Sequence, residues 1–119
     1  MAASIDYANL PTPPACIADF CLIPIGTSTA SVSNEVAAVQ RLMKASGLSY
    51  SMHSAGTTVA EGSWDEVMKL IGQAHTLVHQ NGVLRVQTDI RVGTSRTDKT
   101  QHFSEKVSKV ESILAADPK

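Results

Sequence analysis

Two arginines on one predicted strand are the residues best suited to bind an acidic group. Arg85 and Arg91 alternate with Gln87 and Asp89 along one face of the segment 83–92. A guanidinium binds phosphate or carboxylate bidentately, so this face could capture an anion. The other interpretation is an ion-pair ladder across an interface, because arginines that are covered and unpaired are costly. Residue types alone leave both interpretations open.

The histidines offer weaker chemistry. His75 and His79 are four positions apart on a predicted helix, a spacing that can place two imidazoles on one metal, but no third ligand accompanies them. We expect no metal site. His53, Asp89 and Ser51 contain the residue types of a hydrolytic triad, yet no Gly-x-Ser-x-Gly elbow supports one. We expect these three side chains to form hydrogen bonds, and we predict no catalytic residues.

A glycine-led loop precedes the first predicted helix. Its backbone amides, over residues 26–29, could cradle an anion. The segment lacks the lysine of a P-loop and the three glycines of a dinucleotide fingerprint. It is interpreted either as a plain strand-helix connection or as part of a ligand pocket, and no cofactor is expected.

Composition narrows the class of partner. The 119 residues carry a net charge of −1 and no block of like charge. Nucleic-acid binding needs a basic stripe, and RNA-binding sheets need stacking aromatics, which make up 4% of this chain. No apolar run is long enough for a signal core or a membrane span. We therefore expect neither a nucleic-acid nor a membrane partner.

The two cysteines bear on the compartment. Cys16 and Cys21 are five positions apart, and on a single strand they would point to opposite faces. This arrangement predicts two reduced thiols, which fit an intracellular environment. The expected location is the cytoplasm.

Periodicity predicts the secondary structure. Continuous apolar character marks a strand, strict alternation marks a half-buried strand, and a 3–4 spacing of apolar residues marks a helix. On these signals we predict strands at 15–25, 48–54, 57–61 and 83–92, and helices between 31 and 47, between 63 and 81, and from 103 to 114.

Two local signals are the most specific. Ser63 and Glu66 form the two ends of a capping box, in which the serine hydroxyl accepts from the Glu66 amide and the glutamate reaches back to the Ser63 amide. The last strand alternates apolar and polar residues, so Leu84 is expected to share a buried face with Val86, Thr88 and its other even-numbered neighbours.

The order of elements predicts the fold class. A β-α-β-β-α-β order followed by a helix fits an α+β, ferredoxin-like fold. Its four-stranded antiparallel sheet carries helices on one face, with an additional C-terminal helix. Residues 1–14, rich in proline, are expected to form a flexible N-terminal arm, and residues 15–119 a single domain. A sheet face that is partly apolar and left open suggests pairing with another subunit, a pocket, or both.

Several motifs in order resemble the thiamine-binding (YkoF-like) protein family. They are Pro24-Ile25-Gly26-Thr27, then the segment from Gly56 to Gly62, then Trp64-Asp65-Glu66-Val67, and finally Arg85 to Arg91. The match spans about residues 16 to 99. The segment from Gly56 to Gly62 is one residue longer than the family's pattern, so Thr57 and Thr58 compete for one position. The last strand is followed by Gly-Thr-Ser-Arg, where many relatives carry an acidic pair.

The resemblance implies a ferredoxin-like subunit that forms a homotetramer as a dimer of dimers and binds thiamine or its hydroxymethylpyrimidine moiety. Carried over by position, and with Arg85 added as a candidate anion-binding residue, the expected ligand-binding residues are Thr57, Thr58, Glu61, Arg85, Thr88 and Arg91.

Three functions remain open at the level of sequence. The first is an oligomeric small-molecule binding protein that is not an enzyme. The second is a structural or regulatory oligomer without a ligand. The third is a cofactor-free enzyme that uses a cavity between subunits, which would require an ionisable pair with perturbed pKa values there.

Overall fold

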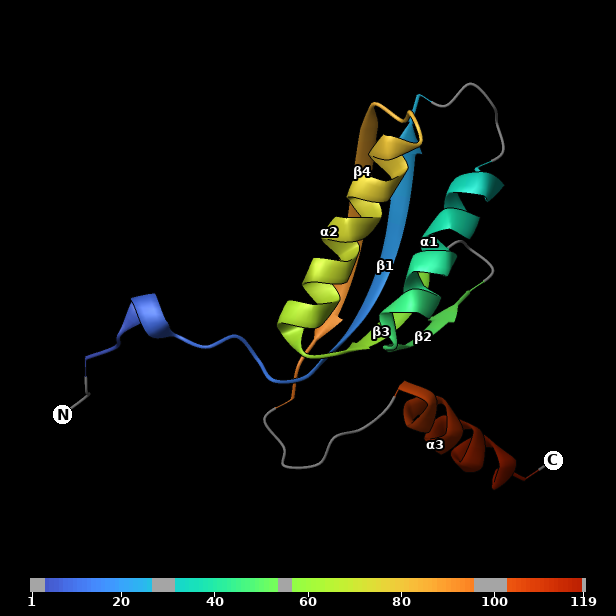
Figure 1. Ribbon diagram of the computed structural model, residues 1–119. Coiled ribbons are helices and arrows are strands. Elements are labelled where there is room, and N and C mark those ends of the chain that lie inside the picture. Colours follow the sequence, from blue (N-terminus) through green and yellow to red (C-terminus); the bar gives the residue numbers. More distant parts are fainter. Residues whose placement is uncertain (1–3, 27–31, 54–56, 96–102, 119) are drawn as a thin grey trace.

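The computed structural model describes residues 4–26, 32–53, 57–95 and 103–118. Its four strands form an antiparallel sheet in the order β2-β3-β1-β4, and α1 and α2 lie side by side over one face of that sheet (Figure 1). After a short 3-10 helix, η1 (Tyr7–Asn9), the elements are β1 (Cys16–Ile25), α1 (Ser33–Ser46), β2 (Ser49–Met52), β3 (Thr58–Gly62), α2 (Trp64–Gln80), β4 (Arg85–Gly93) and α3 (Phe103–Ala115). The predicted α+β, ferredoxin-like class with its C-terminal helix is confirmed.

The register of the sheet decides which side chains face the helices. Phe20 of β1 pairs with Thr58 of β3 on one side and with Ile90 of β4 on the other. Residues directly opposite each other in an antiparallel ladder point to the same face. The helix-covered face therefore carries Phe20, Thr58, Ile90 and the residues two positions away from each. The odd-numbered residues of β1, β3 and β4 line the opposite, open face.

The core lies between the sheet and the two helices. Phe20 of β1, Met43 of α1 and three residues of α2 are almost fully buried: Val67, Ala74 and Val78. The predicted apolar stripes of both helices are thus the faces that pack on the sheet. Burial of each of the larger side chains contributes about 1.5–3 kcal/mol.

Helix α2 begins at the predicted capping box. The Glu66 amide donates to Ser63 Oγ at 3.1 Å, as expected. The reciprocal bond differs from the prediction, because the Ser63 hydroxyl donates to Glu66 Oε1 at 3.0 Å. The Trp64 amide donates to the Pro13 carbonyl at 3.2 Å, so the proline-rich segment also satisfies one of the unpaired amides of this helix end.

The last strand begins later than its alternating sequence predicts. Leu84 was expected on a buried face, and this is wrong: its side chain is 90% exposed, because β4 begins only at Arg85. The loop at 27–31, considered for anion binding, and the predicted hairpin turn at 54–56 lie outside the described residues.

The two ends of the chain differ in their contacts. In the N-terminal segment, Thr12 Oγ1 donates to Asp65 Oδ1 at 2.8 Å. Helix α3 stands apart from the sheet and its covering helices in Figure 1, and its side chains from Ser104 onward are exposed. Val107, Val110 and Leu114 thus form an apolar stripe in contact with solvent.

None of the helices in the described part of the chain combines the length and the apolar character needed to cross a membrane.

Candidate ligand-binding slot under helix α1

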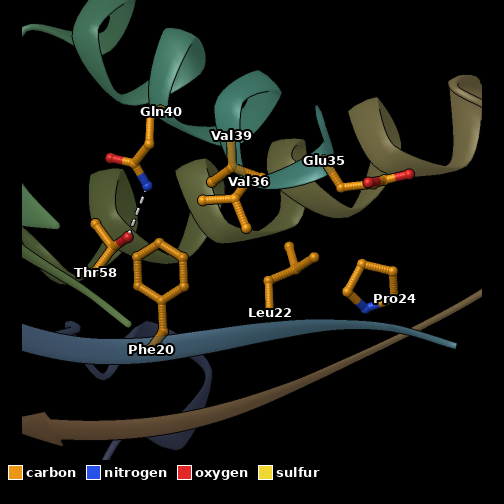
Figure 2. Close-up of a pocket in the computed structure, with 8 residues that line it drawn as sticks. All are labelled: Phe20, Leu22, Pro24, Glu35, Val36, Val39, Gln40 and Thr58. Atoms are coloured by element: carbon orange, nitrogen blue, oxygen red, sulfur yellow. Dashed lines mark hydrogen bonds between the residues drawn. The ribbon is translucent and has the colours of Figure 1, made fainter. Parts of the chain in front are cut away.

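A narrow slot lies between α1 and the sheet (Figure 2). Its floor is made by Phe20, Leu22 and Pro24 of β1, and Val36 and Val39 of α1 form the opposite wall. Its volume is about 10 Å³, close to the space that one water molecule needs. A heteroaromatic ring can therefore enter only if α1 or the side chains under it move.

One end of the slot carries a polar pair, a half-buried Gln40 and a buried Thr58. Gln40 Nε2 donates to Thr58 Oγ1 at 2.9 Å, and Thr58 is only 2% exposed (Figure 2). The pair retains hydrogen-bonding capacity, because the Gln40 amide oxygen is an acceptor and the Thr58 hydroxyl hydrogen is a donor. A ligand at this end can therefore meet a donor and an acceptor on an otherwise apolar surface.

Glu35 marks the other end of the slot. Figure 2 shows this residue above Pro24, with the slot's apolar residues between it and the Gln40–Thr58 pair. A carboxylate accepts hydrogen bonds and favours a cationic or amino group nearby. The slot thus combines apolar walls with polar groups at both ends, which is the usual composition of a small-molecule site.

The structure separates the two threonines that competed for one position. Thr58 lies on the helix-covered face and lines the slot. Thr57 lies just before β3, where its carbonyl accepts from the His53 amide at 2.8 Å, and alternation directs its side chain toward the open face. Of the two, Thr58 is the one positioned in a recess.

Thr88 also lies on the helix-covered face but away from the slot. Its hydroxyl is hydrogen-bonded to His75 Nε2 of α2 at 2.5 Å. Thr88 does not line the slot that contains Thr58. Thr88 of β4 therefore forms a hydrogen bond that links this strand to α2.

The remaining predicted site residues lie on the open face. Arg91 is opposite Asp19, and Glu61 is opposite Ile17, two positions along β1. Strand spacings place the Cα atoms of Glu61 and Arg91 about 12 Å apart. Arg85, six residues from Arg91 on the same strand, is about 20 Å from it. The structure thus brings Glu61 and Arg91 into one half of this face and leaves Arg85 at the other end.

The triad considered from the sequence is not assembled. Ser51 and His53 belong to the β2 side of the sheet, whereas Asp89 is on β4 at the opposite edge. Three strand spacings separate these edges, about 14 Å.

The histidine pair also has other partners. His75 is bonded to Thr88, and His79 Nδ1 is within 2.9 Å of the Val83 carbonyl. Within the described residues, no group of three or more His, Cys, Asp or Glu side chains is arranged to hold a metal ion.

Sequence reasoning missed Glu35, Gln40 and Phe20 as candidate site residues. Gln40 has one available signal, since it follows Val36 by four positions and therefore shares the helix face predicted to be buried. A polar residue on such a face needs a partner. Nothing in the sequence indicates that the partner is Thr58.

Comparison with known proteins gives consistent matches over most of the chain. The model of the family described as thiamine-binding protein matches residues 18–111. The UPF0045 protein ECM15 of Eremothecium gossypii is 48% identical over 99 residues, covering 83% of this chain and 92% of that protein. A UPF0045 protein of Synechocystis is 42% identical over 98 residues, covering 82% and 78%.

Solved structures share the fold. Protein MJ1052 of Methanocaldococcus jannascii superposes with a TM-score of 0.71 at 30% identity, covering 82% of this chain and 97% of that chain. A Thermotoga maritima protein, whose name proposes a role in thiamine biosynthesis or salvage, gives a TM-score of 0.68 at 18% identity, covering 82% and 99%. From the match to the family model and the identities to the curated relatives, this chain belongs to the thiamine-binding protein family.

Proposed function

We propose that this protein is a cytoplasmic homo-oligomer that binds thiamine or its hydroxymethylpyrimidine moiety in the slot under α1, without catalysing a reaction. The observation that carries the proposal is the hydrogen bond between the buried Thr58 and Gln40 at the end of an apolar slot, within the span that matches the family model. The name of the Thermotoga maritima protein of the same fold agrees with this class of ligand.

The chemistry of an aminopyrimidine suits the ends of the slot. Its ring is flat and apolar on both faces, and its edge carries ring nitrogens that accept and an amine that donates. The Thr58 hydroxyl can donate to a ring nitrogen, and the Gln40 amide oxygen or the Glu35 carboxylate can accept from the amine. The apolar faces would lie between Phe20 and Leu22 on one side and Val36 on the other.

Ligand entry requires α1 to move. The closed slot holds about 10 Å³, whereas small-molecule sites commonly have volumes of a few hundred Å³. In the structure Val36 and Val39 of α1 cover the slot from above, so its width depends on the position of α1 over β1. We therefore propose that α1 shifts away from β1 when the ligand binds. The cost of this opening lowers affinity, so we expect modest binding.

The open sheet face supports the proposed oligomer. Ile17, Ile23, Ile25 and Val59 lie on it, and Ile23 and Ile25 are 37% and 42% exposed. Asp19 and Arg91, paired across β1 and β4, add opposite charges in the same face. A face that contains apolar side chains and both signs of charge can pair with a second copy of itself. We propose a tetramer built as a dimer of dimers, with one of its interfaces on this face.

The cytoplasmic location rests on the cysteines. Cys16 and Cys21 are both free thiols, and in β1 they lie on opposite faces of the sheet, as expected from their spacing. Unpaired thiols are typical of a reducing compartment.

Calorimetric titration with thiamine and with hydroxymethylpyrimidine tests the binding proposal. We expect saturable heat from at least one of them, and at least a tenfold loss of affinity in Thr58→Val, because the variant cannot donate to the ligand and leaves Gln40 without its acceptor. Thr76→Val on the exposed side of α2 is the matched control and should bind normally. Absence of heat from both compounds at millimolar concentration would contradict the proposal.

A further inference from the structure

A second, wider recess adjoins the slot along α1. It is a groove of about 730 Å³ between α1 and β2, and it shares Val36 and Gln40 with the slot. Tyr50 and Met52 of β2 form part of its apolar surface, and Met52 is 54% exposed because no other element covers it. The slot and the groove therefore lie next to each other along α1, the narrow slot over β1 and the wide groove over the edge strand.

The described charged residues that line the groove are all basic. Arg41 and Lys44 of α1 line it together with His53, which follows β2, and none of the described residues that line it is acidic. The chain segments 27–31 and 54–56, next to α1 and β2 in the sequence, also contain no acidic residue. In a chain whose net charge is −1, this is a local excess of positive charge beside an apolar surface.

The polar and charged residues of the slot and the groove follow one order along α1. Glu35 lies at the end of the slot that is far from the Gln40–Thr58 pair (Figure 2). Arg41 follows Gln40 in the chain, and Lys44 is one helical turn further on. Along α1 the order is thus a carboxylate, then a neutral donor and acceptor, and then two basic side chains. A ligand with an amine on its ring and an anion on its side chain matches this order.

We propose that the groove between α1 and β2 binds the phosphate group of a phosphorylated heteroaromatic ligand whose ring occupies the slot. This inference rests on the proposed function, because the slot supplies the ring site. Arg41 binds the phosphate bidentately, Lys44 adds a second positive charge, and Tyr50 and Met52 contact the apolar linker. The preferred ligand class is then a phosphate ester of the pyrimidine, not the uncharged alcohol.

Matched ligand pairs test the inference. We expect hydroxymethylpyrimidine phosphate to bind at least tenfold more tightly than hydroxymethylpyrimidine in calorimetric titrations at low ionic strength, on the scale of one charge-assisted contact. Added salt should weaken binding of the ester more than binding of the alcohol, because the charges are exposed. Inorganic phosphate should compete with the ester and leave the alcohol unaffected.

Variants that remove positive charge test whether the preference for the phosphate ester arises in the groove. Arg41→Gln combined with Lys44→Gln should abolish the preference for the ester while leaving affinity for the alcohol unchanged. Lys69→Gln combined with Lys106→Gln removes the same charge from exposed positions on α2 and α3 and should keep the preference. All four positions are exposed, so both double variants are expected to fold, which thermal unfolding checks.

The outcomes separate the two proposals. Equal affinity for ester and alcohol, or a preference that survives in the Arg41/Lys44 variant, overturns the phosphate site and leaves the proposed function standing. Failure of thiamine, the alcohol and the ester to bind overturns both. A preference for the ester that is lost only in the Arg41/Lys44 variant supports the inference.

Discussion

At the scale of single residues, two adjacent threonines have different environments. Thr58 is buried against Gln40, whereas Thr57 points toward the other face of the sheet. The difference follows from the period of two in a strand, since a shift of one residue moves a side chain from one face to the other. The sequence shows both threonines but contains no local signal for the register of β3 against β1. For this reason the candidate site could be narrowed to a segment and not to one residue.

A double-mutant cycle measures the coupling free energy between Thr58 and Gln40 in the slot. Thr58→Val, Gln40→Leu and the double variant should give a coupling of about 1 kcal/mol in free energy of unfolding, the usual net value of such a hydrogen bond. Chemical denaturation supplies the three differences. The cycle between Gln40 and the distant Thr76 is the control, and its coupling should be near zero. A coupling near zero for the first pair as well would show that the hydrogen bond does not form in solution.

Ionisation of the Cys16 thiol should lower the free energy of unfolding at alkaline pH. Burial raises the pKa of the Cys16 thiol above its ordinary value. When folding raises the pKa of a group, that group stabilises the folded chain in full at pH values below its pKa in the unfolded chain, which is about 8.5 for a thiol. This stabilisation is lost as the pH rises through the pKa of the group in the folded chain. We expect the free energy of unfolding to fall above about pH 8.5, and to fall less steeply in Cys16→Ala.

The measurement is urea denaturation across the alkaline range under reducing conditions. Cys21→Ala is the matched control, because it removes the other thiol and keeps the buried one, so it should retain the wild-type loss of stability. If Cys16→Ala and the wild type lose the same free energy with rising pH, ionisation of Cys16 is not the cause.

At the scale of elements, local signals gave the order of strands and helices. Continuous apolar character marked β1, alternation marked β4, and the capping box marked the start of α2, because each is a pattern within a few residues. The slot could not be predicted in this way. It needs Glu35 and Gln40 of α1 to meet Phe20 and Thr58 across the core, and that meeting depends on the position of α1 over the sheet.

Removing the N-cap of α2 tests whether this local signal stabilises the helix. Ser63→Ala removes the hydroxyl that accepts from the Glu66 amide and should lower the free energy of unfolding by about 1 kcal/mol. Ser104→Ala, at an exposed position in α3, should change it by less than about 0.5 kcal/mol. Denaturant unfolding of both variants provides the comparison, and equal effects would argue against a capping role for Ser63.

At the scale of the whole molecule, the described chain leaves two apolar surfaces uncovered besides the groove between α1 and β2. One is the open face with Ile23 and Ile25, and the other is the stripe of α3 with Val107 and Val110. The open face follows from the fold class and could be expected from the sequence. The separation of α3 from the rest of the molecule could not, because the apolar periodicity that predicts a helix says nothing about which surface covers it.

Substitution on the open face tests the proposed oligomer. Ile23→Arg should convert the tetramer into a dimer without loss of helical content, because the side chain is already 37% exposed in the single chain and the charge would be buried only between the subunits that meet on this face. Leu84→Arg is the control, since Leu84 is 90% exposed outside the strand. Light scattering coupled to size exclusion gives the masses. An Ile23→Arg protein with the mass of the wild-type oligomer would exclude this face as the interface.

The most direct test of the central claim, that the slot under α1 is the ligand-binding site, is a titration of the isotope-labelled protein with hydroxymethylpyrimidine followed by amide NMR shifts. We expect the largest shifts to cluster at Phe20, Gln40 and Thr58, with smaller shifts along α1 as it moves away from the sheet. Shifts that cluster instead around Glu61 and Arg91 on the open face, or no shifts at saturating ligand, would contradict it.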